Sequence, residues 1–384
     1  MRIVYTLNSA KPGGMEKHVA ELVQGMVQFG HQVYVICPGG ELSKWYSSLG
    51  AQVKELAINS EIDLNYILKV ITYFKQIKPD VVHSHELKSV VNTLIAAHLA
   101  GIKIKVSHTH TPISEWKVSD LKKFVNKIIN TLVVNLFSTK EIALTNSVKT
   151  IKISEGIINS KLEVLSNGID LSLFEIDEHM KELYRSEIFS KYSIKKDSFV
   201  LGNISRLSEE KGHFVLLEAF KNIALSNKNM TLLLCGGGVL ESKIRSFVSE
   251  NGFQDQVTIT GLFDESEKIK LLCAFDLLVF PSLAEGFGYV PIEAMSLGIP
   301  VLASDLPVIK EVCAENVSYF LTGDSESLEN RIQEKLLKMK SLDSKMQAEL
   351  KKAKLFVKEN YSIEMFWEKY NNLYLKLYEN TVSK

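Results

Sequence analysis

The sequence predicts an α/β protein with two doubly wound parallel sheets, and three observations lead to that prediction. Short β-branched runs alternate with amphipathic segments along most of the 384 residues, a pattern typical of parallel strands joined by crossover helices. A chain of this length exceeds what one hydrophobic core usually supports. A polar segment rich in lysine and glutamate, at 176–196, separates the runs into two sets.

We therefore expect one domain at 1–175, a linker at 176–196 and a second domain at 197–362. The strand candidates are RIVYTLN, QVYVIC, DVVHSH, IKIKVSH, IALT and KLEVLSNG in the first domain, and FVLGNIS, TLLLCG, VTITG, LLVFPS and VLAS in the second. The final segment, about 363–384, repeats apolar residues at helical spacing, namely Phe366, Tyr370, Leu373 and Leu377. We interpret it as a helix that crosses back to pack on the first domain, with a membrane or partner helix as the alternative.

Composition limits the setting of the protein. Basic and acidic residues number 45 each, so no global charge favours nucleic acid as a partner. The four cysteines are far apart and form no C-x-x-C pair, which indicates reduced thiols in a cytoplasm. The N-terminus enters a strand-like run directly, without a signal peptide, and no apolar run approaches the ~20 residues that span a bilayer.

The stretch PSLAEGFGYVPIEAMSLGIPVLAS contains two carboxylates, Glu285 and Glu293, on either side of a predicted helix start. The N–H groups of Gly286, Phe287 and Gly288 would form an anion site there, supported by the helix dipole. We expect carboxylates beside an anion to accept hydrogen bonds from ligand hydroxyls. The alternatives are a metal site, which would need more oxygen ligands than this segment offers, and a glycosidase-like acid/base pair.

Two cations support the anion site. Arg206 follows a predicted strand and Lys211 lies at the start of the next helix, where a cation opposes the helix dipole unless an anion is also bound. The planar fork of arginine and the compact charge of lysine suit a diphosphate on which charge develops. The alternative is a pair of solvated surface cations, partly matched by Glu209 and Glu210.

A third glycine-rich element, Gly13 and Gly14 in GGMEKHVAEL, precedes an amphipathic helix. Adjacent glycines let a backbone approach a ligand closely, and the helix start again presents N–H groups. The segment matches neither the dinucleotide fingerprint nor the P-loop. An ordinary tight turn remains the alternative.

Taken together, AEGFGYVPIE, SRLSEEKGH, KPGGMEKH and VLSNGIDLSLF resemble the retaining glycosyltransferases of family four, which have the GT-B fold. The resemblance runs in order along almost the whole chain. Its motifs are specific jointly, although none is specific alone. It implies a nucleotide-sugar in the C-terminal domain, with the active site in the cleft between the two domains.

The resemblance also implies roles for individual residues. Glu293 would bind the ribose hydroxyls, Glu285 the hydroxyls of the transferred sugar, and the Gly286–Gly288 backbone the diphosphate and sugar. Arg206 and Lys211 would hold the diphosphate as the leaving group, and Gly13 and Gly14 would approach it from the N-terminal domain. We expect base contacts near Leu262, between Gly261 and Phe263.

The resemblance further implies that a histidine in VSHTHTP faces the donor sugar, and we prefer His108 to His110 because His108 ends the apolar run. His83 and His85, at another strand end, are expected on the acceptor side. The two His-x-His pairs suggest zinc, but the sequence identifies no third ligand and similar enzymes are metal-independent. We therefore predict neither metal nor cofactor.

These implications add up to a metal-independent enzyme that retains anomeric configuration. It would move a hexose or N-acetylhexosamine from a nucleotide-sugar, UDP-linked in our prediction, to a glycan or polyprenyl-linked acceptor in surface-polysaccharide, lipopolysaccharide or capsule assembly. A nucleotide-sugar-binding regulator without transfer activity is the alternative, although it would not need the leaving-group cations. A phosphorylase or epimerase would be an analogy of architecture only.

The segment WKVSDLKKFVNKIINTLVVNLF, at 116–137, mixes lysines with apolar residues. The lysines are Lys117, Lys122, Lys123 and Lys127, and the apolar residues include Trp116, Leu121, Phe124, Val125 and Ile128. Such a helix could lie on an anionic membrane, at the cytoplasmic face of the inner membrane. The alternative is a core-packed helix with a solvated lysine face.

Overall fold

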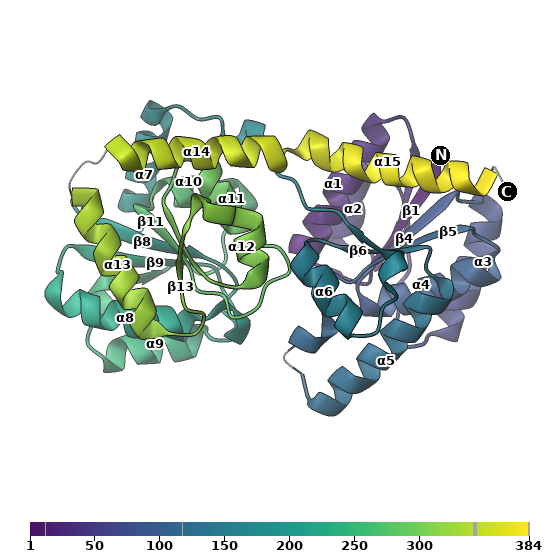
Figure 1. Ribbon diagram of the computed structural model, residues 1–384, viewed down its shortest axis with the longest axis horizontal. Helices are drawn as coiled ribbons and strands as arrows, with labels where there is room; N and C mark the ends of the chain where they lie inside the picture. The colour runs from purple at the N-terminus through teal and green to yellow at the C-terminus, as the bar shows by residue number, and fades with distance from the viewer. Residues whose placement is uncertain (12, 117, 341–343, 383–384) are drawn as a thin grey trace. The chain divides into compact units, whose positions relative to one another are not determined.

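The structure, a computed structural model, describes residues 1–11, 13–116, 118–340 and 344–382. The chain forms two compact units: Met1–Gly168 together with Ile363–Lys384, and Ile169–Ser362. Each unit contains a parallel sheet with helices on both faces (Figure 1). The predicted fold class is therefore confirmed.

The N-terminal unit has a seven-stranded sheet in the order β3-β2-β1-β4-β5-β6-β7. Its strands are β1 (Arg2–Thr6), β2 (Gln32–Cys37), β3 (Gln52–Glu55), β4 (Val81–His85), β5 (Ile104–His108), β6 (Lys140–Ala143) and β7 (Leu162–Val164). Its helices are α1 (Gly14–Gln28), α2 (Glu41–Ser48), α3 (Leu64–Ile77), α4 (Leu87–Leu99), α5 (Asp120–Phe137), α6 (Asn146–Ser154) and α15 (Ile363–Val382). The winding direction reverses between β1 and β4, and doubly wound sheets bind ligands at such a switch point.

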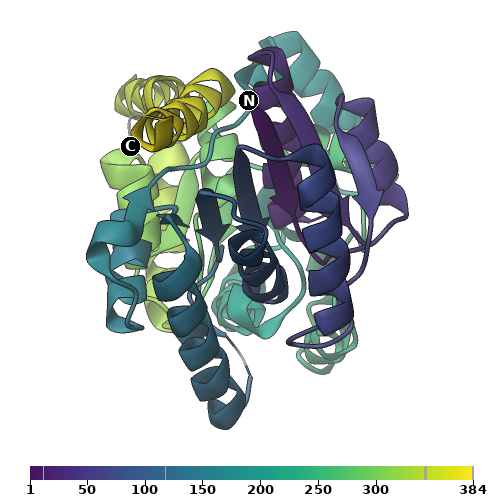
Figure 2. The same ribbon diagram turned by 90° about the vertical axis from the view of Figure 1, so that its right-hand side faces the viewer.

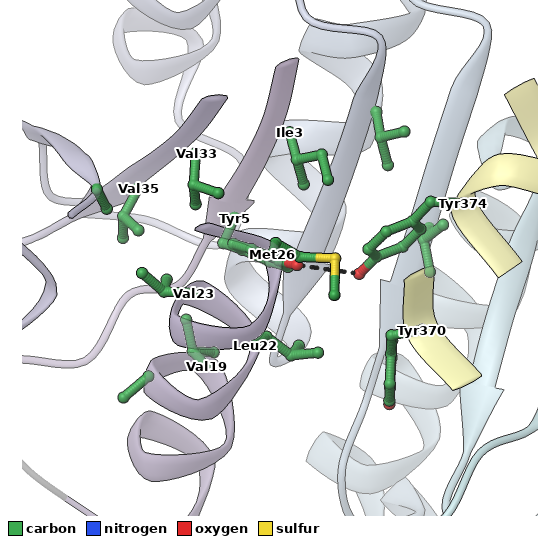
Figure 3. Packing of buried hydrophobic residues seen from close by; sticks show 14 of the residues in the cluster. Ile3, Tyr5, Val19, Leu22, Val23, Met26, Val33, Val35, Tyr370 and Tyr374 are labelled. Carbon is green, nitrogen blue, oxygen red and sulfur yellow. Dashed lines mark hydrogen bonds between the residues drawn. The ribbon is translucent and has the colours of Figure 1, made fainter. Parts of the chain in front are cut away.

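The C-terminal helix α15 completes the core of this unit. The stripe predicted from its sequence, including Phe366 and Tyr370, is buried against α1 and the sheet. Figure 3 shows Tyr374 of α15 beside Met26 and Tyr5, with the two tyrosine hydroxyls 3.3 Å apart. The interpretation of this segment as a packed helix, in preference to a membrane or partner helix, is confirmed.

The C-terminal unit has a six-stranded parallel sheet in the order β10-β9-β8-β11-β12-β13. Its strands are β8 (Phe199–Ile204), β9 (Met230–Cys235), β10 (Val257–Ile259), β11 (Leu277–Phe280), β12 (Val301–Ser304) and β13 (Ser318–Phe320). Its helices are α7 (Glu178–Lys191), α8 (His213–Ser226), α9 (Glu241–Glu250), α10 (Lys268–Cys273), α11 (Tyr289–Ser296), α12 (Pro307–Cys313), α13 (Ser325–Lys340) and α14 (Ser344–Asn360). Here the winding direction reverses between β8 and β11.

The segment 176–196, which we predicted as a linker, contains helix α7. Asp177 caps this helix by accepting a hydrogen bond from the backbone N–H of Met180. Arg185 then joins it to the C-terminal unit through a hydrogen bond to the carbonyl of Ala274 and an ion pair with Asp276. The boundary between the units lies at Gly168, not at residue 175. Helix α7 packs through charged and hydrogen-bonding side chains, and in sequence such a polar segment looks like a linker.

Candidate functional site

The switch point of the C-terminal unit brings together the segments that follow β8 and β11. The two strands are hydrogen-bonded neighbours, with Leu201 opposite Leu277 and Gly202 opposite Leu278. Arg206 and Lys211 follow β8, whereas the carboxylate segment that begins at Pro281 follows β11. The parallel arrangement therefore places both predicted groups at one edge of the sheet.

Backbone contacts hold these two strand exits against each other. Gly212 has a φ of +67°, and a Cβ there would lie only 2.0 Å from the carbonyl oxygen of Pro281, so a side chain at this position would collide with backbone. The backbone N–H of Leu283 donates to the carbonyl of Glu210 over 2.8 Å. The short helical turn that carries Lys211 is thereby fixed beside the exit of β11.

This packing places Lys211 in contact with Glu285. The lysine Nζ lies 2.5 Å from Oε1 of the carboxylate, and both side chains are largely buried. The hydroxyl of Ser282 donates to the same oxygen over 3.0 Å. The alternative interpretation, in which Lys211 is a surface cation matched by its neighbouring glutamates, does not describe this arrangement.

Arg206 lies in a different environment. Its side chain is 79% exposed and lies 3.3 Å from the carboxylate of Glu210. An exposed ion pair of this kind contributes little stability, so the guanidinium can turn toward an anion at small energetic cost. The structure thus provides one largely buried cation and one adaptable cation after the same strand.

The Gly286–Gly288 segment leads into α11, with Pro291 in the first turn of the helix as predicted. Gly288 has a φ of +91°, which glycine tolerates best. The side chain of Phe287 is buried and packs edge-on against Tyr361, with ring centroids 5.6 Å apart. A role for this segment in ligand binding would therefore use its backbone N–H groups.

Glu293 is buried in α11 and forms an ion pair with Lys268, at the start of α10, over 2.7 Å. Sequence reasoning missed Lys268, because no pattern in the charged run DESEKIK separates this lysine from surface charges. A buried carboxylate without a partner would be strongly destabilising. Lys268 is therefore the residue that permits a carboxylate at this position.

Sequence reasoning also missed the glycines that follow β9. Gly236 and Gly238 approach the chain after β8 so closely that a Cβ would lie 2.1 Å from the carbonyl oxygen of Ser205 and 2.4 Å from that of Leu207. The run of three glycines in TLLLCGGG was the signal available. These contacts fix the turn that carries Arg206.

Leu262, which we predicted beside the nucleotide base, follows β10. Its side chain is 89% exposed. Gly261 before it has a φ of +70° and pairs with Gly236 in an isolated bridge. The structure thus presents an apolar side chain to solvent next to the exits of β8 and β9.

In the N-terminal unit, Gly13 and Gly14 lie at the start of α1, and both are exposed. Gly13 is extended, with a φ of −170°, a conformation open to any residue. The space beside Gly14 is open, since a Cβ there would meet no atom within 4 Å. The approach of these glycines to a ligand remains a prediction.

The predicted histidines gather at the carboxyl edge of the N-terminal sheet. His85 ends β4, His108 ends β5, and His110 follows two residues later. His18, on α1, joins them, with its ring centroid 4.9 Å from each of the last two. The sequence suggested two His-x-His pairs without a third partner, because it could not show that α1 brings His18 to the same place.

Burial changes the acid–base chemistry of these imidazoles. It lowers the pKa of His18 to about 3, although the hydrogen bond between Nδ1 of His18 and the side-chain oxygen of Asn167 acts in the opposite direction. Burial, reinforced by the neighbouring histidines, also lowers the pKa values of His85, His108 and His110 well below the ordinary value. All four imidazoles are therefore neutral near pH 7.

The backbone is strained immediately after His85. Glu86 adopts a φ of +63° and a ψ of 159°, a region that only glycine populates readily. Its carboxylate compensates by accepting hydrogen bonds from the N–H groups of Lys88 and Ser89, which caps α4. Strain of this kind is common at functional sites.

Helix α5 carries the apolar face predicted for 116–137. Its outward residues are between 40% and 74% exposed, namely Leu121, Phe124, Val125, Ile128, Leu132 and Leu136. The buried residues are Asn126, Asn130, Val133 and Val134. Lys117 lies outside the described residues. Among those described, no helix has both the length and the apolarity that crossing a bilayer requires.

Comparison with known proteins gives a consistent result. The family model for Glycosyltransferase Family 4 matches residues 12–173, and the model for Glycosyl transferases group 1 matches residues 184–354. The capsular polysaccharide biosynthesis glycosyltransferase CapM of Staphylococcus aureus is 26% identical over 373 residues, which are 92% of this chain and 93% of CapM.

Two further proteins are informative. The UDP-Gal:alpha-D-GlcNAc-diphosphoundecaprenol alpha-1,3-galactosyltransferase of Escherichia coli is 27% identical over 248 residues, 64% of this chain and 62% of that protein. The crystal structure of Anabaena HepE in complex with UDP-glucose superimposes with a TM-score of 0.84 at 21% identity and covers 100% of both chains. HepE therefore supports the GT-B fold.

Proposed function

This chain belongs to the glycosyltransferases, with a family 4 half at 12–173 and a group 1 half at 184–354, and from that premise we propose its reaction. It transfers a hexose or N-acetylhexosamine from a UDP-sugar to a glycan or polyprenyl-linked acceptor. The transfer retains the anomeric configuration and needs no metal ion. The product is a precursor of a surface polysaccharide such as capsule or lipopolysaccharide.

The observation that carries this proposal is the contact between Lys211 and Glu285 at the switch point of the C-terminal unit. A nucleotide-sugar offers a negative diphosphate next to a hydroxylated ring, and a cation beside a carboxylate complements both. On binding, the lysine would exchange its carboxylate partner for phosphate oxygens. The carboxylate would then accept hydrogen bonds from the sugar.

The proposed chemistry asks for charge stabilisation more than for a dedicated base. The bond between the anomeric carbon and the phosphate oxygen breaks, and its electron pair stays on the departing UDP. The acceptor hydroxyl attacks the same face and passes its proton to the departing phosphate. Arg206 and Lys211 stabilise the charge that develops there, in the role that a metal ion has in other enzymes.

The choice of donor and acceptor rests on similar proteins. HepE was crystallised with UDP-glucose, and the Escherichia coli relative is a UDP-Gal transferase acting on a diphosphoundecaprenol-linked sugar. The Staphylococcus relative belongs to capsular polysaccharide biosynthesis. Leu262, which is exposed next to the exits of β8 and β9, offers an apolar surface to the uracil base.

The donor assignment is tested by thermal unfolding with a panel of nucleotide-sugars and nucleoside diphosphates. We expect UDP and one UDP-sugar family to raise the Tm, roughly 5 °C or more at 100 times the Kd. Glu293→Gln should abolish most of this rise, because an uncharged amide with one acceptor oxygen binds the ribose hydroxyls more weakly than a carboxylate does. The matched control, Glu326→Gln, changes an exposed carboxylate on α13 and should respond like the wild type.

The outcomes of this experiment separate the alternatives. No rise with any nucleotide, in folded protein, would contradict the proposed function. A rise that Glu293→Gln leaves unchanged would reject the site while leaving nucleotide binding intact. UDP binding without transfer to any acceptor would favour the regulatory alternative.

We also propose that α5 attaches the protein to the cytoplasmic face of the inner membrane. Its outward face is apolar, whereas an ordinary surface helix buries that face. Lys122, Lys123 and Lys127 flank it and would attract anionic headgroups. In both views the helix extends beyond the sheet of its own unit (Figures 1 and 2).

Sedimentation with lipid vesicles tests this attachment. We expect binding to vesicles that contain phosphatidylglycerol and weak binding to phosphatidylcholine alone. The double variant Leu121→Ser, Phe124→Ser should bind at least roughly 100-fold more weakly, since each side chain contributes about 1.5–3 kcal/mol when buried. The control, Leu225→Ser, removes an exposed leucine from the other unit. Equal binding by the double variant, or a dimer in light scattering that the double variant loses, would reject membrane attachment through α5.

A further inference from the structure

The four histidines of the N-terminal unit have a geometry that the transfer reaction does not explain. Each of His18, His85, His108 and His110 offers one nitrogen such that all four atoms lie within 4.8 Å of one another. We propose that these imidazoles form a binding site for a transition-metal ion, with Zn²⁺ as the expected occupant. This inference replaces the sequence-based expectation of no metal and does not depend on the proposed function.

The spacing of the rings suits such a site. In a tetrahedral zinc site with Zn–N bonds of about 2.0–2.1 Å, the ligand nitrogens lie about 3.3 Å apart. Nδ1 of His85 and Nε2 of His110 are already 3.2 Å apart. The remaining ligand nitrogens lie within 4.8 Å of one another, so a bound ion would draw them closer together.

The hydrogen-bonding state of the cluster also favours an ion. Within the described chain, Nε2 of His18, Nε2 of His85 and both ring nitrogens of His108 are buried without a hydrogen-bond partner. Buried polar atoms in that state cost free energy. A metal ion would satisfy Nε2 of His18 and one ring nitrogen of His108, since each imidazole offers the ion a single atom.

The donor set also suits a transition-metal ion, because each of the four imidazoles offers one ring nitrogen. Imidazole nitrogen suits Zn²⁺, Cu²⁺ and Ni²⁺. Four nitrogens match the four-coordinate preference of zinc.

Asn167 orients one of the ligands from outside the cluster. Nδ1 of His18 lies 2.8 Å from its side-chain oxygen, so Nδ1–H donates to that oxygen and the lone pair of Nε2 points toward the other histidines. Metal-binding histidines usually have such a partner, which fixes the tautomer and the ring orientation. Asn167 is buried and thus well suited to this role.

The charges around the cluster do not oppose the binding of a cation. Lys152 is a positive charge beside the cluster, and its ammonium donates to the carbonyl of Thr109, which lies between two of the ligands in sequence. Its charge is neutralised by a buried ion pair with Glu141. His83 is not one of the four, and its Nδ1 lies 2.7 Å from the hydroxyl of Tyr374.

Metal binding should also inhibit sugar transfer. This consequence, unlike the binding itself, rests on the proposed function. His108 is the residue predicted to face the donor sugar. An ion coordinated by this imidazole would compete with the sugar for it. Zn²⁺ would therefore inhibit transfer, and its removal by a chelator would restore activity.

Calorimetric titration of Zn²⁺ into chelator-treated, metal-free protein tests the site, with the visible absorption of Co²⁺ as a second probe of coordination. We expect one equivalent to bind. His110→Asn should weaken binding at least tenfold, and this half-buried position is the ligand whose replacement disturbs the fold least. Asn167→Ala should weaken binding by roughly 10–100-fold, the usual cost of losing an orienting partner.

The control is His98→Asn, which removes an exposed histidine from α4 of the same unit and should leave affinity unchanged. Circular dichroism of each metal-free variant verifies folding. Absence of saturable binding at one equivalent by folded wild-type protein would overturn the proposal. So would an equal loss of affinity in His98→Asn and His110→Asn. If Zn²⁺ binds but does not inhibit transfer, the site stands and the role of His108 toward the sugar falls.

Discussion

Replacing Lys211 with alanine is expected to nearly abolish sugar transfer while the protein stays folded. The lysine is the largely buried cation at the switch point of the C-terminal unit, and the departing UDP gains charge there as the bond to the sugar breaks. Removing one pre-oriented group that stabilises such charge typically costs 10²–10³-fold in kcat. We expect a loss of that size in a UDP-release assay.

The matched control for this prediction is Lys221→Ala, since Lys221 lies on α8 in the same unit and forms only a surface ion pair with Glu218. It should transfer sugar at the wild-type rate. Glu285→Ala should also be nearly inactive, because it removes both the partner of Lys211 and the acceptor for the sugar hydroxyls. Turnover close to wild type in Lys211→Ala or Glu285→Ala would remove the assignment of this site.

The second large effect that we expect is the unfolding of the N-terminal unit in mild acid. Five of its histidines have lowered pKa values: His18, His83, His85, His108 and His110. The unfolded chain takes up protons near pH 6.5 that the native unit excludes, so stability is lost as pH falls below 6.5. Each such histidine contributes about 1.4 kcal/mol per pH unit, and for His18 the loss continues to about pH 3.

The free energy of unfolding of a protein domain is usually about 5–15 kcal/mol. A few histidines acting together would remove that amount within one or two pH units. Urea unfolding at pH 8, 7, 6 and 5, in the presence of a chelator, measures the effect. The C-terminal unit provides an internal comparison, since its buried His213, with a pKa lowered to about 4 chiefly by burial, adds only one group of this kind. A urea midpoint of the N-terminal unit that is the same at pH 7 and pH 5 would contradict the prediction.

The parts of the fold that were predictable from sequence depend on local pattern. Strand runs, the Pro291 helix start and the stripe on α15 follow from the periodicity of apolar residues. That periodicity does not say which apolar stripe is covered. The stripes of α15 and α5 look alike in sequence, yet Phe366 is buried and Leu121 is 74% exposed, because burial depends on what the rest of the chain packs against each helix.

The parts of the site that were not predictable depend on contacts between distant segments. Lys268 lies 25 residues before Glu293, and His18 is far along the chain from His85 and His108. Neither pair has a spacing motif, so only the folded sheet brings its members together. By contrast, Glu285, Arg206 and Lys211 each follow a strand at the carboxyl edge of the sheet, and strand order is enough to place them at one site.

The central claim is that the exits of β8 and β11 hold the diphosphate of a UDP-sugar, and amide hydrogen exchange with saturating UDP tests it most directly. Bound phosphates should slow exchange in peptides spanning 205–213 and 282–293, where N–H groups at the starts of helices would gain partners. Exchange in the helix α6 of the N-terminal unit should not change. Saturating UDP that leaves both peptides unprotected, while protecting another part of the chain, would contradict the account.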